Sequence, residues 1–192
     1  MRRSTFVFVL CLAVAFTGCG LSRSRVNYNR EDVDLGMITR VAVLPFANNS
    51  KDQFAAERVR DVAITQILAL GIADVVDKGI VDSVMREEAI EPNRPIDLIN
   101  LKRLGQRLNV QAFVLGTIDE AEDVRRGSLS FPELALTLRL VDSRASVVLW
   151  QASGRRTSET WAGRLFGLAP GDSFHNTLYL VRDLFKTLSS AK

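Results

Sequence analysis

The chain of 192 residues is poor in the side chains on which most enzyme chemistry depends. It has one histidine, His175, and two cysteines, Cys11 and Cys19, so catalytic triads and metal clusters have little to draw on. It contains neither a G-x-x-x-x-G-K-[ST] phosphate loop nor a G-x-G-x-x-G dinucleotide fingerprint, which leaves nucleotide binding without support. The sequence therefore predicts a protein that is not an enzyme and that holds no cofactor and no metal ion.

A strong excess of charge of one sign is also missing. The formal net charge is +3, and it falls to +1 when Arg2 and Arg3 are removed with a signal peptide. Such a balance gives no argument for a nucleic-acid partner. The apolar fraction of 47% is high enough for a packed core, which excludes a disordered chain.

Polar clusters that could carry chemistry have simpler explanations. Asp172, Ser173 and His175 lie close together, but without a G-x-S-x-G elbow they are typical of a helix N-terminus with capping residues. The acidic residues between 119 and 123 lack the alternating ligands and the turn glycine of a calcium loop. We interpret them as a solvated loop.

The N-terminus has the pattern of an export signal. Arg2 and Arg3 precede an apolar run over residues 6–16, which is too short to span a bilayer as a helix. The next residues, ending in Gly18 and Cys19, resemble the bacterial lipobox, whose cysteine is lipidated and becomes the first mature residue. The alternative is ordinary secretion with cleavage after residues 13–15, an A-x-A-like site.

The lipobox resemblance predicts the address of the protein. Residues 1–18 are then a lipoprotein signal peptide and Cys19 carries the acyl chains, such as palmitate, that anchor it in a membrane; two or more chains anchor stably. Gly20 is not the Asp that retains such proteins at the inner membrane, so we expect the periplasmic face of the outer membrane. The polar residues 19–37 are predicted to be a flexible tether.

Residues 38–192 are predicted to form one α/β domain. Short apolar or alternating runs predict strands, and apolar residues at spacings of three and four predict helices. The expected order is β-α-β-α-α-β-β-β-α, a mixed β-sheet of about five strands flanked by about four helices. The expected strands are 40–46, 72–77, 111–118, 134–141 and 147–153, the helices are 52–70, 79–90, 97–108 and 173–188, and two connections are loops, 119–133 and 155–173.

Four segments in this order resemble the periplasmic lipoproteins related to CsgG and LpoB: residues 40–49, 75–88, 104–116 and 138–150. The resemblance covers about residues 38–190, and the family's domain is similar to the N-terminal domain of TolB. It implies a non-enzymatic interaction or assembly module of the cell envelope, an LpoB-like regulator or accessory factor that binds another envelope protein. The alternative is a subunit of a CsgG-like oligomeric secretion complex. We expect no CsgG-like pore, because neither predicted loop supplies uninterrupted spanning hairpins.

Candidate partner-binding residues fall in three places. Asn48 and Asn49 follow the first strand, where open α/β sheets place their sites, although they also suit a helix-entry turn. Trp161 and Phe166 lie in the glycine-punctuated connection, as a docking surface or as a lid on the core.

The third candidate place is basic. Arg125 and Arg126, together with Arg155 and Arg156, flank strands and could converge at one end of the sheet. They are either solvated charges or a site for an envelope phosphate or an acidic partner.

Overall fold

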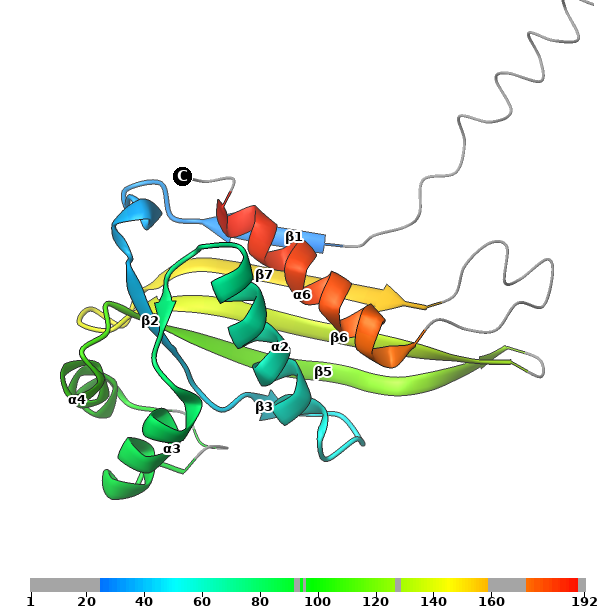
Figure 1. The fold of residues 1–192 in the computed structure, drawn as a ribbon, viewed down its shortest axis with the longest axis horizontal. Coiled ribbons are helices and arrows are strands. Elements are labelled where there is room, and N and C mark those ends of the chain that lie inside the picture. The colour runs from blue at the N-terminus through cyan, green and yellow to red at the C-terminus, as the bar shows by residue number, and fades with distance from the viewer. Residues whose placement is uncertain (1–24, 92–93, 95, 127–128, 159–171, 190–192) are drawn as a thin grey trace, which may run out of the picture.

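The computed structural model describes residues 25–91, 94, 96–126, 129–158 and 172–189 (Figure 1). Its centre is a seven-stranded mixed sheet in the order β1-β7-β6-β5-β2-β4, with β3 pairing β5. The predicted α/β class, a mixed sheet flanked by four helices, is confirmed, with seven strands where about five were expected. The strands are β1 Arg25–Asn29, β2 Arg40–Val43, β3 Ala47–Asn48, β4 Asp74–Val75, β5 Ala112–Arg126, β6 Leu129–Asp142 and β7 Val148–Thr157.

Aspartates cap the starts of two helices, α3 Lys78–Glu87 and α4 Leu98–Leu108. Asp77 accepts from the amides of Gly79 and Ile80 at the start of α3, and Asp97 accepts from the Asn100 amide at the start of α4. Asn109 ends α4 in the left-handed conformation. The helices are α2 Ala55–Ala69, α3 Lys78–Glu87, α4 Leu98–Leu108 and α6 Ser173–Ser189, preceded by the 3-10 turn η1 Leu35–Met37. In the described part of the chain, no helix is long and apolar enough for a membrane crossing.

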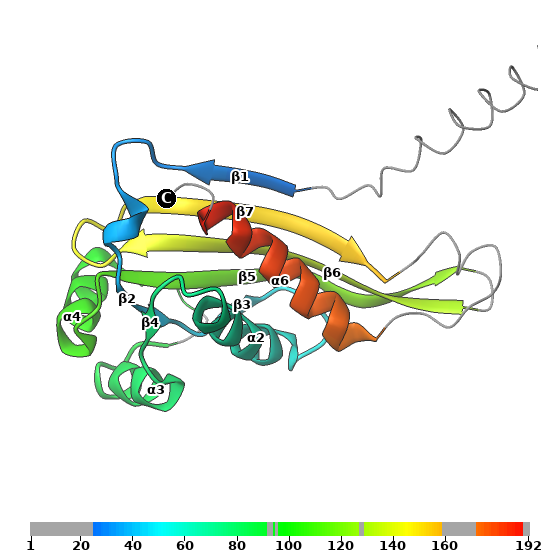
Figure 2. The same cartoon turned by 45° about the horizontal axis from the view of Figure 1, so that its top comes forward.

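The helices cover the two faces of the sheet unequally. α2 and α6 lie on one face (Figure 2). There Trp150 is fully buried and stacks on Phe185 with ring centroids 5.7 Å apart. α3 and α4 pack on the other face, with Leu104 against the side of β2 and β5 that carries Phe113. Strands β6 and β7 pair beyond these two helices, so their outer face carries polar side chains such as Thr137.

The loop predicted over residues 119–133 is wrong. β5 and β6 pair from Ala112 opposite Asp142 to Arg126 opposite Leu129, with one register shift between Ile118 and Glu120. The charged side chains are compatible with a strand here because backbone hydrogen bonds hold the hairpin and its end has no neighbouring strand. The result is a hairpin that projects beyond the rest of the sheet (Figure 1).

The tether predicted over residues 19–37 is wrong for its second part. Arg25–Asn29 form β1, which pairs antiparallel with β7, and η1 buries Leu35 in the core. β1 is held by the backbone ladder along β7 rather than by burial, since Val26 is 73% and Tyr28 53% exposed.

Candidate functional site

A cleft of about 660 Å³ opens where β2 ends, between α2 and α3. From β2 the chain crosses through α2 to β4 at the sheet edge and then returns through α3 and α4 to β5 on the other side of β2. Open α/β sheets place ligand sites at the carboxyl end of a strand where the crossovers diverge in this way. The apolar part of the lining is formed by Pro45, Phe46, Met85 and Ile90, and the polar part by Asn48, Ser50, Gln53, Glu57, Arg60, Asp82 and Arg86.

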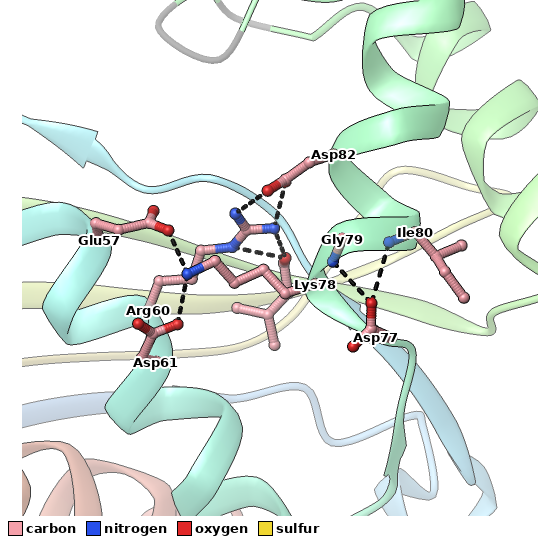
Figure 3. A network of polar contacts seen from close by, with 9 residues as sticks. Glu57, Arg60, Asp61, Asp77, Lys78, Gly79, Ile80 and Asp82 are labelled. Carbon is pink, nitrogen blue, oxygen red and sulfur yellow. Dashed lines mark hydrogen bonds and ion pairs between the residues drawn. The ribbon is translucent and has the colours of Figure 1, made fainter.

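Arg60 is the buried charge at the base of the cleft. The Val76 amide donates to the Val41 carbonyl, but β4 ends there, which leaves the Val43 carbonyl two residues later without a ladder partner. The guanidinium of Arg60 supplies that partner, with Nε 3.2 Å and Nη2 2.9 Å from the Val43 oxygen (Figure 3). Arg60 therefore replaces a missing strand at the edge of β2.

Asp82 on α3 balances this charge. Arg60 donates through Nη2 to Oδ1 at 2.7 Å and through Nη1 to Oδ2 at 3.1 Å, a two-point pair that fixes the relative position of α2 and α3. The Arg60 side chain is 1% exposed, whereas the Asp82 side chain is 30% exposed toward the cleft. Only the carboxylate side of the pair is therefore open to a ligand.

A second ionic bridge joins the same two helices. Lys78, at the start of α3, donates to Asp61 Oδ1 at 2.6 Å and pairs with Glu57, both on α2 (Figure 3). Partial burial lowers the pKa of Lys78, but the hydrogen bonds from the Asp61 and Glu57 carboxylates outweigh it, and the pKa lies above its ordinary value. Charge-assisted bonds therefore join α2 to α3 at two points.

Asn48 lines the cleft, and its side chain is used within the turn that follows β3. Its amide nitrogen donates to the Asp52 carbonyl at 2.8 Å, and its oxygen accepts from the Ser50 amide and hydroxyl. Asn49 is exposed, and its backbone amide donates to the Ile118 carbonyl. This geometry agrees with the helix-entry interpretation of the two residues, and a binding role for them stays a prediction.

Two polar side chains are left to meet a ligand. Gln53 and Arg86 are exposed at the cleft and make no side-chain hydrogen bond or ion pair within the described residues. Below them, Phe46 and Met85 offer a buried apolar floor. Among the residues described, no group of three or more histidine, cysteine or acidic side chains could hold a metal ion. The arrangement is suited to binding a side chain or short segment of a partner.

The predicted convergence of the two arginine pairs is wrong. Arg125 lies opposite Ser130 near the hairpin tip, whereas Arg155 lies opposite Ala135, five positions further along β6. Arg155 instead pairs with Glu120 at 2.5 Å and Glu133 at 3.1 Å.

Arg156 points to the α6 face. It lies 5.0 Å from the ring centroid of Tyr179 and 3.8 Å from Asp183, so it is used within the fold. Of the basic candidates, Arg125 is exposed, and the backbone alone is described for Arg126. Cys19, Trp161 and Phe166 lie outside the described residues.

The one histidine of the chain lies at the start of α6. His175 is exposed, with Nδ1 3.4 Å from Asp172 Oδ2, and Asp172 accepts from the Phe174 amide at 3.2 Å. This is the helix N-terminus that the sequence predicted.

Comparison with known proteins shows which solved structures have a similar fold. No family model matches the chain, and no curated protein matches it. Solved structures share the fold. The PelC dodecamer from Paraburkholderia phytofirmans is 18% identical, with a TM-score of 0.60 over 86% of this chain and 96% of that one. Lipoprotein GNA1162 from Neisseria meningitidis is 19% identical, with a TM-score of 0.56 over 79% and 99%.

LpoB also has this fold. The NMR structure of E. coli LpoB is 9% identical, with a TM-score of 0.50 over 65% of this chain and 60% of that one. The resemblance to LpoB that the sequence suggested therefore extends to the fold. The resemblance to CsgG stays a prediction from the sequence.

Proposed function

We propose that this chain is an outer-membrane-anchored periplasmic lipoprotein whose domain binds another envelope protein and has no enzymatic activity of its own. The observation that supports it is the shared fold with GNA1162, a lipoprotein, in a chain whose lipobox-like segment ends at Cys19. The LpoB fold adds support for an accessory or regulatory role in the envelope.

The anchor is tested by Cys19→Ser. We expect the wild-type chain to be processed and recovered in the outer-membrane fraction, and the variant to stay unprocessed or to become soluble in the periplasm. Mass spectrometry of the wild-type N-terminus checks acylation directly. Unchanged processing and membrane recovery of the variant would refute the anchor.

The partner site is tested by photocrosslinking in intact cells. A benzophenone amino acid at Gln53, in the cleft, is expected to capture one protein, whereas the same group at Lys102, exposed on α4, is expected to capture none. A Trp161→Ala/Phe166→Ala variant that carries the Gln53 probe shows whether capture of the partner at the cleft also depends on the 155–173 connection. Equal capture from Gln53 and Lys102 would contradict a specific cleft.

A second candidate is a subunit of an oligomeric complex, supported by the dodecameric state of PelC. The open polar face of β6 and β7, with Thr137, Arg139, Gln151 and Ser153, offers a surface for such contacts. Sedimentation of the unlipidated chain distinguishes the two functions. A monomer at all concentrations would rule out a ring in its simple form.

A further inference from the structure

The structure shortens the tether between Cys19 and the domain. The sequence predicts a tether to residue 37, but β1 begins at Arg25 and is fixed to β7 from that residue onward. Six residue steps therefore separate Cys19 from the sheet, and a fully extended chain of that length reaches about 20 Å. An acylated Cys19 lies at the lipid surface, so Arg25 lies within about 20 Å of it.

The β5–β6 hairpin extends beyond the Arg25 end of β1 by a similar length. Arg25 lies opposite Gly154 on β7, and Gly154 lies opposite Leu136 on β6. From Leu136, β6 continues for seven residues to Leu129 at the hairpin tip, a distance of about 23 Å at about 3.3 Å per residue. Figure 2 shows the hairpin reaching past the ends of β1 and β7 on the side from which the chain enters β1.

When the strands stand roughly perpendicular to the lipid surface, six residue steps hold Arg25 within about 20 Å of that surface, and the hairpin reaches about 23 Å beyond the level of Arg25 toward it. We propose that the tip of the β5–β6 hairpin, with Arg125 and Leu129, contacts the phospholipid surface in which Cys19 is anchored. This inference rests on the lipid anchor of the proposed function and adds the orientation of the domain to it.

The distribution of charge along the hairpin fits this contact. Arg125 is exposed at the tip, and its guanidinium makes no hydrogen bond or ion pair within the described residues. Among the acidic side chains, Asp123 is exposed two residues before Arg125. Glu120, Glu122 and Glu133 lie further back, where Arg155 pairs with Glu120 and Glu133 and Lys51 lies 3.5 Å from Glu122. A cation at the tip is attracted to lipid phosphates, whereas an acidic stem is not, which limits the contact to the tip.

The test uses the acylated full-length protein in vesicles of phosphatidylethanolamine and phosphatidylglycerol. The thiol of Cys19 is acylated, and Cys11 lies in the predicted signal peptide, so an introduced cysteine is the one free thiol. Ser130→Cys, opposite Arg125, carries a fluorophore near the tip. Ile99→Cys, 69% exposed on α4 at the other end of the sheet, is the control (Figure 1). Nitroxide-labelled lipid in the vesicles quenches a label that touches the surface.

We expect strong quenching at position 130 and none at position 99. Arg125→Glu is expected to reduce the tip contact about fivefold or more, since one basic residue near an anionic surface contributes about that factor. Arg144→Glu, the same change in the exposed turn between β6 and β7, is expected to leave it unchanged. Equal quenching at 130 and 99, or equal effects of the two charge reversals, would overturn the proposal. Loss of vesicle binding by the wild-type protein would instead refute the anchor.

Discussion

Asp82→Ala is expected to destabilise the domain more than any other loss of a single charge in the cleft. The substitution leaves the guanidinium of Arg60, 1% exposed, without its counter-ion. Removing one partner of a buried ion pair costs about 3–5 kcal/mol. The Val43 carbonyl still accepts from Arg60, and the cleft admits water to the vacated position, so we expect the lower end, about 3 kcal/mol.

Arg60→Met is expected to cost less, about 2 kcal/mol. It leaves the Val43 carbonyl without a partner, a loss of about 1–3 kcal/mol, while the carboxylate of Asp82 can turn to solvent because it is 30% exposed. In the Arg60→Met background the Asp82→Ala change removes nothing further from the buried site. The double variant should therefore equal the Arg60→Met variant to within about 0.5 kcal/mol.

Urea denaturation of the unlipidated chain followed by circular dichroism measures these free energies of unfolding. For a domain of this size, about 3 kcal/mol corresponds to a fall in Tm of roughly 6–12 °C. Two results would refute the reasoning: a cost below about 1 kcal/mol for Asp82→Ala, or strictly additive effects in the double variant. Either would mean that Arg60 is hydrated rather than buried with its partner.

Two further predictions concern acid and packing. Hydrogen bonds from Arg107 hold the pKa values of Glu87 and Glu88 below their ordinary value, so they stabilise the fold above about pH 4.5 and this stability is lost as the pH falls through the lowered pKa values. Urea titrations at neutral and acidic pH should show a smaller loss for Arg107→Gln than for wild type; equal losses would contradict this. Gly116→Ala places a Cβ 2.6 Å from the buried Phe46 ring and should cost about 1–3 kcal/mol in urea, with partial rescue by Phe46→Leu.

The sequence predicted the parts of the fold whose side chains are buried in a regular period. The central strands and all four helices have apolar residues at the spacing of their secondary structure, and burial makes that spacing necessary. At the end of the β5–β6 hairpin, exposed charged residues such as Glu122, Asp123 and Arg125 interrupt the apolar residues, so the sequence there shows no regular apolar period although Phe131 is buried. Pro132 is compatible with this strand because it lies beyond the end of β7, where its nitrogen has no ladder partner to meet.

Strand β1 did leave a signal, but a short one. Val26 and Tyr28 alternate with polar residues, the period of a half-buried strand, over five residues. Such a length is too short to be distinguished from a polar tether, and the pairing with β7 depends on a segment far along the chain. Tertiary hydrogen bonding, which sequence periodicity cannot report, decides the structure here.

The burial of Arg60 could be predicted from its position in the sequence of α2. It lies three residues before Ala63 and seven before Ile67, so it belongs to the buried face of α2 rather than to the charged face with Glu57 and Asp61. A charge on an apolar helix face indicates a buried partner, but the identity of that partner could not be predicted. Asp82 lies on a different helix, and the free carbonyl of Val43 exists because β4 ends after two residues.

The positions of the cleft and of the hairpin tip limit where a partner can bind. Asn48, which lines the cleft, pairs with Ile118 on β5, and eight residues of β5 separate Ile118 from Arg126 at the tip. That distance is about 26 Å along the strand. With the tip on the lipid surface, as we propose, a segment that enters the cleft lies within about 26 Å of the membrane. The partner must then bring its binding segment to the membrane that holds Cys19, because a tether of six residues cannot carry the domain away from it.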